Sequence, residues 1–380
     1  MNKLSQFSFA AAFLAVASAA GVQFSSALSA APRTRDAASD EARLLRDFAR
    51  IEPIDTHVHI YKNDPALNAL VERLNLRAVN ICVIDDRDPD FRDLEPQRTQ
   101  VLQVRKSTGG RLAFCTTFRP YAFEEPGFRE RAIRQLNGDF AQGALAVKIY
   151  KVMGMEMKSK AGKWVMPDDA AFEPIYRDIA EHHRTMIAHL AEPDSCWQAP
   201  NPASPDFRYY KEHPGEYAFL HPEWPAKAAI LAARDRLVSA NPDLRVVGAH
   251  LGSMESNVED IARRFDSYPN FAVDMAARLP YFMIQPHDKV RAFLLKYQDR
   301  VLYATDLVVE PRAKTGDTLA EFRRTYARDW KFLATSGEVE YLGRTYRGLA
   351  LPRPVLRKIF HDNAVHWFPG IMESAASGAR

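Results

Sequence analysis

Eight short apolar runs recur along the chain, and longer amphipathic stretches separate them. The runs are IEPIDTHVHI, AVNICVID, RLAFCTTF, GALAVKIY, TMIAHLA, LRVVGAHLG, NFAVDMAA and RVLYATDLV. The stretches between them have helical patterns, and several carry Pro or Asp near the start, as helix N-termini often do. Examples are Pro167 to Arg184, Pro225 to Ala240, Glu255 to Phe265 and Pro286 to Tyr297. A strand followed by a helix, repeated eight times, predicts a (β/α)8 TIM barrel of the α/β class.

An open, doubly wound parallel sheet is the alternative arrangement for this alternation. That fold usually places a G-x-G-x-x-G turn after its first strand, and the sequence has none there. The alternating pattern extends over residues 51–370 of the 380 residues, a normal size for one barrel. We therefore predict one barrel domain over 51–370.

Two segments depart from the even rhythm. Residues 192–224 form a long connection after the fifth strand that is rich in Pro and aromatic residues. Connections of this length in compact domains are often lids or binding loops, so we expect it at the mouth of the barrel. Residues 315–368 follow the eighth strand, and we expect a C-terminal helical extension that covers one end of the barrel.

The N-terminus has the pattern of an exported protein. An early Lys3 precedes an Ala-rich apolar stretch over 9–22, which is shorter than the roughly 20 residues of a membrane span. A small-x-small cleavage pattern lies at 17–19 and a second near Ala30. We predict a Sec-type signal peptide over 1–30 and a secreted or periplasmic protein that has no membrane insertion after cleavage. An uncleaved membrane anchor is the alternative.

On either side of the predicted domain, residues 31–50 form a leader segment and residues 371–380 a flexible tail. The charge is nearly balanced, with 51 basic and 48 acidic residues, and no basic run points to nucleic acid. Three cysteines are too few and too dispersed for a disulfide framework. We therefore expect a fold that does not depend on oxidation, and a small-molecule substrate. The oligomeric state stays open, a homo-oligomer included.

Two histidines stand two positions apart in the first apolar run. Side chains alternate along a strand, so His57 and His59 point to the same face, with Asp55 expected behind them. A lone buried histidine is usually a hydrogen-bonded core residue. Two on one face need more partners, and a divalent metal can satisfy both rings at once.

Other runs also carry a polar residue near their end, where the catalytic residues of barrels lie. These residues are Lys148 in the fourth run, His189 in the fifth, His250 in the sixth and Asp306 in the eighth. In the fourth run, alternation places Leu145 toward the helices and Lys148 toward the barrel interior, whereas Asp274 in the seventh run is undetermined. Imidazoles and a carboxylate suit a divalent metal, so the pattern predicts a metal site.

These motifs resemble those of the amidohydrolase superfamily of metal-dependent TIM-barrel enzymes, specifically its amidohydrolase-related branch. The features are the DTHVH opening, His189 after the fifth strand, GAHLGS around His250, ATD at Asp306 and the closing KIFHDNAVHWFPG. The resemblance covers about Ile51 to Gly370.

The resemblance implies a role for each residue. His57, His59 and His189 would bind the metal, and Asp306 would bind it as well and serve as general base. His250 would be either a ligand of a second metal or the group that polarises the substrate carbonyl. In binuclear members a strand-four lysine is carboxylated and bridges two metals, and Lys148 occupies that strand. Alternatively, an unmodified Lys148 pairs with a substrate carboxylate.

We therefore expect one or two divalent metals per chain, with Zn first and Mn or Fe as alternatives. The leading function is hydrolysis of a C–O or C–N bond in a small carbonyl compound such as a lactone, ester or amide. The alternative is metal-dependent decarboxylation of a small aromatic acid, which the same branch also performs. A non-catalytic binding protein would need a broken set, but both His250 and Asp306 are present.

Overall fold

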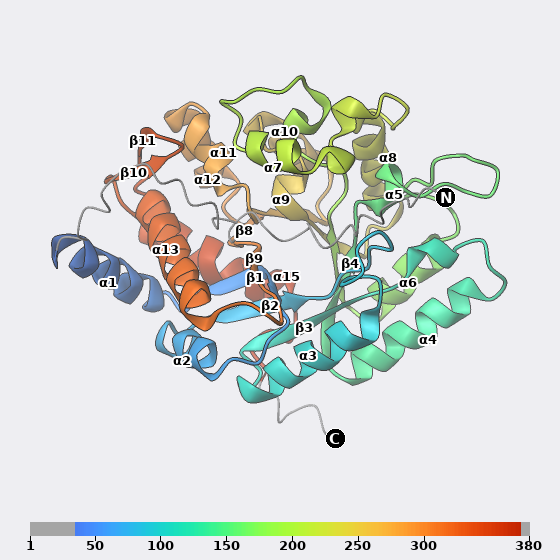
Figure 1. Ribbon diagram of the computed structural model, residues 1–380, viewed down its shortest axis with the longest axis horizontal. Helices are drawn as coiled ribbons and strands as arrows, with labels where there is room; N and C mark the ends of the chain where they lie inside the picture. The colour runs from blue at the N-terminus through green and yellow to red at the C-terminus, as the bar shows by residue number, and fades with distance from the viewer. Residues whose placement is uncertain (1–34, 374–380) are drawn as a thin grey trace, which may run out of the picture.

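The computed structural model describes residues 35–373 and contains one large parallel sheet (Figure 1). Its nine strands lie in the order β8-β7-β6-β5-β4-β3-β2-β1-β9. Their bounds are β1 Ile54–Ile60, β2 Arg77–Ile81, β3 Leu112–Thr117, β4 Ala144–Ile149, β5 Thr185–Ala188, β6 Arg245–Gly248, β7 Phe271–Asp274, β8 Val301–Leu302 and β9 Leu307–Val309. Each predicted apolar run therefore forms a strand, and the eighth forms two.

The sheet closes because β8 and β9 are two pieces of one strand position. The Thr56 amide donates to the carbonyl of Tyr303, which follows β8, at 3.0 Å. Further along, the Asp306 amide donates to the His57 carbonyl at 2.8 Å, and β1 then pairs with β9. The order and the closure confirm the (β/α)8 barrel and exclude an open doubly wound sheet.

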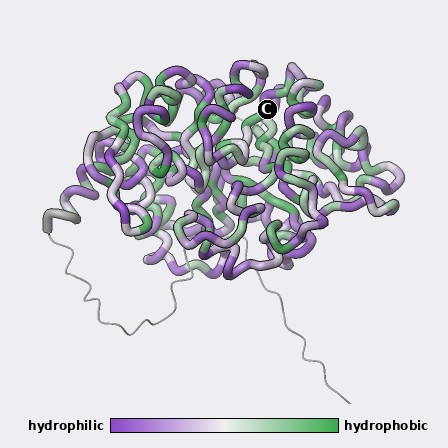
Figure 2. Tube along the Cα trace, turned by 90° about the horizontal axis from the view of Figure 1, so that it is seen from above, coloured by the Kyte–Doolittle hydropathy of each residue, from purple (hydrophilic) through white to green (hydrophobic). Residues whose placement is uncertain are grey.

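Helices surround the barrel (Figure 1). They include α2 Pro65–Arg73, α3 Leu94–Ser107, α4 Phe128–Ala141, α6 Glu173–Glu181, α8 Lys227–Ala240, α10 Val258–Ser267, α12 His287–Lys296 and α13 Thr315–Ala334. The four predicted helices are present but begin later than expected. α10, for example, begins at Val258 because the Asn257 side chain accepts from the Glu259 amide and caps it at that point. Hydrophobic and hydrophilic residues alternate along the trace (Figure 2), as amphipathic elements require.

The barrel interior is a separate apolar cluster with members from each of β1 to β8. Leu145 belongs to this cluster, so the expectation that it faces the helices is wrong. The β3–β4 pairing steps from Phe114–Ala144 to Cys115–Ala146, and this register shift turns Leu145 inward. Beyond the shift, Val147 packs in the outer core and Lys148 points inward, as the alternation predicts.

The C-terminal segment contacts both ends of the barrel, whereas the sequence predicted that it covers one end. Trp367 and Phe368, at the end of α15 (Asn363–Trp367), join the interior cluster, and the Trp367 carbonyl accepts from Thr185 at the start of β5. The hairpin of β10 (Glu338–Tyr341) and β11 (Arg344–Arg347) instead reaches the mouth, where Tyr341 lines a cavity.

An N-terminal helix, α1 (Arg35–Ala49), packs on α13, where Phe48 stacks on Tyr326 with ring centroids 5.0 Å apart. The predicted signal peptide, 1–30, lies outside the described residues, as do residues 374–380 of the predicted tail. Over 35–373 no helix is both long and apolar enough to cross a membrane. The three cysteines are free and buried.

Candidate metal centre and substrate cavity

A cavity of about 130 Å³ opens at the carboxyl ends of the strands, where barrel enzymes carry their active sites. The long loop predicted to lie at the mouth does so: it contributes Glu192, Asp206 and Tyr209. All six site residues that the sequence predicted at the strand ends line this cavity: His57, His59, Lys148, His189, His250 and Asp306.

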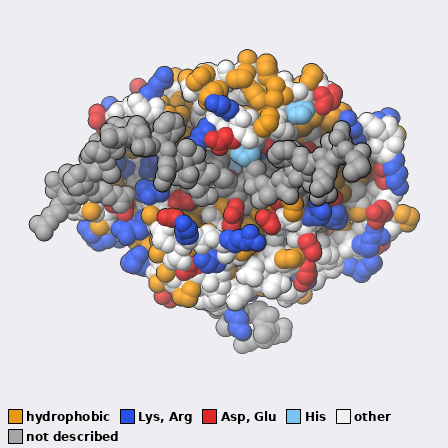
Figure 3. Space-filling view, viewed as in Figure 1, with side chains coloured by type: hydrophobic (Ala, Val, Ile, Leu, Met, Phe, Trp, Pro, Cys, Tyr) orange, Lys and Arg blue, Asp and Glu red, His pale blue; other side chains and the backbone are white. Residues whose placement is uncertain are grey.

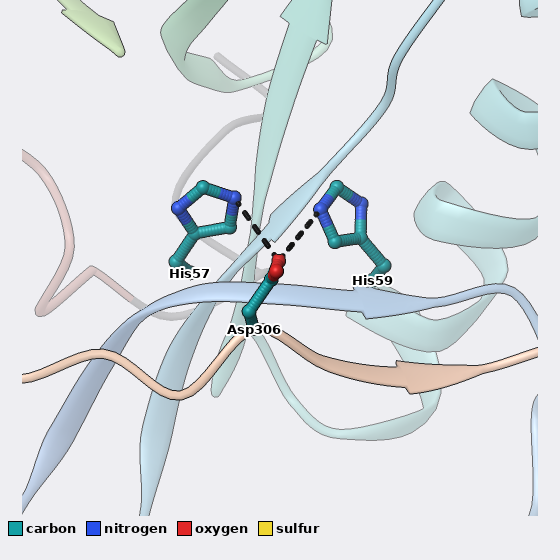
Figure 4. Close-up of side chains that lie close together, drawn as sticks. All are labelled: His57, His59 and Asp306. Carbon is teal, nitrogen blue, oxygen red and sulfur yellow. Dashed lines mark ion pairs between the residues drawn. The ribbon is translucent and has the colours of Figure 1, made fainter. Parts of the chain in front are cut away.

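Three of these residues form a compact ligand set (Figure 4). One ligand atom from each of His57, His59 and Asp306 lies within 4.8 Å of the others. The nearer carboxylate oxygen of Asp306, Oδ1, is 3.5 Å from His57 Nε2 and 3.4 Å from His59 Nε2. Both rings are buried. Two imidazole nitrogens and one carboxylate around one point are a candidate site for a divalent metal.

Hydrogen bonds at Nδ1 of the two rings turn Nε2 of each ring toward this point. His57 Nδ1 lies 2.9 Å from Asp274 Oδ2, and His59 Nδ1 lies 3.0 Å from the Ile81 carbonyl. We therefore assign the proton of each ring to Nδ1, which leaves the Nε2 lone pairs facing Asp306. This arrangement is the one found in metal-binding histidines, so the residues fit a bound cation.

The sequence placed Asp306 within the eighth strand. In the structure it lies in a break of that strand, between β8 and β9. Its φ of 65° is left-handed, a conformation that Asp tolerates better than most residues. Burial opposes ionisation of this carboxyl, but His250, His59 and His57 together hold its pKa well below the ordinary value. Asp306 is therefore a carboxylate, ready to accept a proton or bind a cation.

Asp55 does not stand behind the histidines, and that expectation is wrong. It accepts from the Thr305 hydroxyl at 2.5 Å and from the Tyr326 hydroxyl of α13 at 3.1 Å. The pairing of β1 with β2 shifts register between Asp55 and Val58. The shift places Ile54 in the barrel interior and turns Asp55 toward the outer helix.

Asp274, left undetermined by the sequence, supports the site from beneath. It is fully buried, and its second oxygen accepts from the His250 amide at 2.8 Å and the Ala276 amide at 3.1 Å. One carboxylate thus fixes the His57 ring and the backbone at His250, whose φ of 58° is left-handed. The sequence did not show which way the Asp274 side chain points, because β7 ends at this residue.

His189 and His250 are neighbours beside the three-residue set, and the His250 ring centroid lies 5.1 Å from that of His57. The ring centroids of His189 and His250 are 4.2 Å apart, and His250 Nδ1 lies 3.0 Å from the Ala276 carbonyl. Within 35–373, His189 Nε2 is buried and has no partner at hydrogen-bond distance, and Glu192 Oε1 lies 3.6 Å from it. Burial lowers the pKa of His189 to about 4, so its ring is neutral. An unpartnered buried imidazole nitrogen is the kind of atom that a metal or its water satisfies.

Lys148 lies where the sequence placed it. Its side chain is almost fully buried, and Nζ is 3.0 Å from His57 Nε2. Burial lowers its pKa to about 8. The amine therefore reaches the ligand set itself, which keeps both sequence-based roles open: a carboxylated bridge and an unmodified partner for a substrate carboxylate.

The loop side of the cavity holds charged residues that sequence reasoning missed. Lys151 Nζ contacts Glu192 Oε1 and lies 3.2 Å from Glu216 Oε2. Glu192 Oε2 in turn lies 3.4 Å from an Arg278 nitrogen. Burial raises the pKa of Glu192, but Lys151, His189 and Arg278 outweigh this and hold it well below the ordinary value. The one available signal was the position of Glu192, three residues after His189.

Fold and site together define a metal-dependent TIM-barrel enzyme. A family model described as Amidohydrolase matches residues 94–370, and the chain belongs to this family of metal-dependent enzymes. The match begins beyond β1, so His57 and His59 lie outside it. No curated protein matches the sequence significantly.

Three solved structures are similar to the chain at low identity. A dihydroxybenzoic acid decarboxylase from Polaromonas sp. JS666 with bound manganese is 12% identical, with 84% of this chain and 97% of that chain covered and a TM-score of 0.49. A dihydroorotase from Campylobacter jejuni is 11% identical, with 83% and 82% covered and a TM-score of 0.43. A 4-oxalomesaconate hydratase from Rhodopseudomonas palustris is 12% identical, with 83% and 95% covered and a TM-score of 0.43.

Proposed function

We propose that the protein is a metal-dependent hydrolase that cleaves a C–O or C–N bond of a small carbonyl compound such as a lactone, ester or amide. The observation that carries the proposal is the set of His57, His59 and Asp306 around one point, with Lys148 3.0 Å from the same His57 nitrogen. In that position a carboxylated Lys148 would reach a second cation.

Some residues of the site would bind the cation, and others would transfer protons. His57 and His59 would hold the cation, with Asp306 and the unpartnered His189 Nε2 as the nearest further ligands. A divalent cation supplies Lewis acidity, which polarises a carbonyl and lowers the pKa of water to about 7. Zn is our first choice because imidazole suits it, with Mn and Fe as alternatives.

Asp306 is placed to move the proton of the reaction. As an ionised carboxylate in the cavity wall it can take a proton from an attacking water and return it to the leaving group. His250 faces the same cavity with Nδ1 donating to a backbone carbonyl, so the lone pair of its Nε2 is available to a second cation. To polarise a substrate carbonyl oxygen, Nε2 would have to carry a proton as well.

Decarboxylation of a small carboxylic acid is the second candidate, and the buried Lys148 also favours it. An unmodified ammonium 3.0 Å from His57 Nε2 would pair with a substrate carboxylate beside the cation and would need no second metal. The two candidates therefore differ in the state of one side chain.

The deciding experiment measures metal per chain and product together. Protein purified without chelator is analysed for metal content and for the mass of the Lys148 peptide, and turnover of lactones, esters and aromatic acids is followed by acid release and CO₂ release. Lys148→Met is compared with Lys160→Met, which alters an exposed lysine. Two metals, lost in part with Lys148→Met, support the hydrolase. One metal with CO₂ release supports the decarboxylase, and no metal uptake contradicts both.

We also propose that the mature protein is exported through the predicted signal peptide. The apolar stretch over 9–22 and the small residues that follow it support this proposal. N-terminal sequencing of the protein from a periplasmic or culture fraction tests it. A start between residues 20 and 31 is expected, and an intact Met1 in the cytoplasmic fraction would contradict export.

A further inference from the structure

A second concave region lies on the outside of the barrel, between α1, α2 and α13. These helices lie together at one side of the molecule, and α13 packs against both of the others (Figure 1). The groove that they enclose has a volume of about 410 Å³. Pockets for small ligands measure roughly 300–1,000 Å³, so the groove is of a size to hold one. It shares no lining residue with the metal cavity.

The lining of this groove is unusual in its charge. Of its eight residues, four are alanine or leucine and four are arginine, and none is acidic. The arginines are Arg46 in α1, Arg50 just after it, Arg73 at the end of α2 and Arg323 in α13. A concave surface lined by charges of one sign concentrates the electrostatic potential and attracts ions of the other sign. The groove therefore suits an anion.

Two of the arginines have acidic partners outside the lining. Arg50 lies 2.9 Å from Asp47, and Arg323 lies 3.0 Å from Glu41. Both pairs are exposed at the arginine, and exposed pairs of this kind contribute little to stability. An anion in the groove could therefore share these guanidinium groups at small cost.

The other two arginines, Arg46 and Arg73, are exposed and pair with no acidic side chain among residues 35–373. Both lie in the last turn of a helix, where a cation interacts favourably with the helix dipole. That effect gives no reason for Arg323, which lies within α13, or for Arg50, which lies beyond the end of α1. The helix ends alone therefore do not explain why four arginines line one groove.

We propose that this groove binds a phosphate group, carried by a small soluble ester or by a lipid headgroup. The two-pronged fork of one arginine satisfies a carboxylate, whereas a phosphate offers more oxygens and up to two charges and can bind several guanidinium groups at once. Leu45 and Leu74 in the lining would contact the carbon atoms next to the phosphate. The inference goes beyond the proposed function and does not depend on it.

The first arm of the test titrates the metal-loaded full chain with glycerol 3-phosphate and follows binding by phosphorus NMR. The double variant Arg46→Gln/Arg73→Gln should weaken binding at least tenfold. Lysine at both positions keeps the charge but loses the planar fork, and should weaken it at least threefold. Arg43→Gln is the matched control, because Arg43 is 53% exposed on α1 and lies outside the groove. Phosphate bound at the metal centre would persist in every variant and is thereby told apart.

The second arm distinguishes the two sources of the phosphate. Co-sedimentation with vesicles of phosphatidylglycerol or of phosphatidylcholine is measured at about 0.15 M salt, which screens general attraction between surfaces. Binding of the soluble ester without binding of vesicles identifies a small ligand. Binding of phosphatidylglycerol vesicles that the double glutamine variant loses identifies a lipid headgroup.

Arg323→Gln reads the α13 side of the groove and should weaken phosphate binding at least threefold, whereas Arg324→Gln, its exposed neighbour outside the groove, should not. Urea unfolding of all variants shows whether they fold. Lower stability with unchanged phosphate binding would leave the arginines a role at the helix ends only and overturn the inference, as would equal losses in the control variants or no binding in either arm. Metal content and turnover should stay unchanged throughout, so this inference and the proposed function fail separately.

Discussion

The two sides of the cavity are built differently. The strand-end floor consists of seven residues, and backbone ladders or buried hydrogen bonds set their positions: His57, His59, Lys148, His189, His250, Asp274 and Asp306. The loop wall consists of Glu192, Asp206, Arg278 and Tyr341, which come from loops and a hairpin. In the floor, imidazole rings turn one nitrogen toward a common point. In the wall, opposite charges face one another.

This difference separates the chemistry from the choice of substrate. The floor holds lone pairs and a carboxylate, so it fits a cation and a proton transfer whatever the rest of the substrate is. The wall lines the same cavity with paired charges and aromatic rings, so we expect it to act on substrate choice. Hydrophobic side chains also gather at the upper edge of the molecule (Figure 3), on the side where the long loop lies in Figure 1.

Replacing Asp306, the proposed general base in the floor, should have the largest effect. Asn tolerates the left-handed φ of position 306, so Asp306→Asn should fold normally and lower kcat/KM by about 10²–10⁴ through loss of the base. Turnover and circular dichroism are measured beside Asp243→Asn, an exposed control. Unchanged turnover in Asp306→Asn would remove this residue from the mechanism.

Acid should destabilise the metal-free protein through the buried floor residue His189. His189 has a pKa of about 4 in the fold against 6.5 ordinarily, so between these values the unfolded chain binds the extra proton. Metal-free protein should therefore lose roughly 3 kcal/mol from this histidine as the pH falls from 7 to 4. Urea unfolding at several pH values checks this against His189→Gln, which should show a shallower dependence. Parallel curves for the two proteins would contradict the neutral, buried ring.

Asp274→Asn should weaken the metal centre without removing a ligand. The carboxylate accepts from three N–H groups, whereas an amide would turn its own NH₂ toward one of them. Loss of such a support typically lowers metal affinity about 10–100-fold. Competition with a metal chelator measures the affinity, with Asp243→Asn again as control. An unchanged affinity would show that the His57 ring is held without Asp274.

A change beside the wall, at a residue that contacts the cavity residue Lys151, should leave the metal unaffected. Glu216 lies 3.2 Å from Lys151 and 3.0 Å from Arg87, so Glu216→Gln should cost about 1 kcal/mol and loosen residues 192–224. Urea unfolding and limited proteolysis report on stability and loop cleavage, and metal content is measured alongside. Glu223→Gln, in the same loop but 57% exposed, is the control. A loss of metal in Glu216→Gln would mean that floor and wall are not separable.

Much of the floor could be predicted from the sequence. A period of two places His57 and His59 on one side of a strand, and polar residues near the ends of parallel strands meet at one edge. His250 and Lys148 follow from the same rule, which needs only the order of the strands.

The alternation failed wherever pairing lost its regular register. Asp55 and Leu145 lie at register shifts, and Asp306 lies in a break of its strand. The direction in which each of these side chains points depends on how its strand pairs with the neighbouring strand. The residues of the strand itself do not encode that pairing.

The sequence by itself thus determined the barrel, the two-histidine strand and the kinds of atoms offered to a metal, because local periodicity fixes these. Only the tertiary structure decided that Asp274 supports His57 and that Glu192 and Asp206 flank Arg278. Loops have no period, and the partner of a buried charge is whichever opposite charge the fold brings within reach.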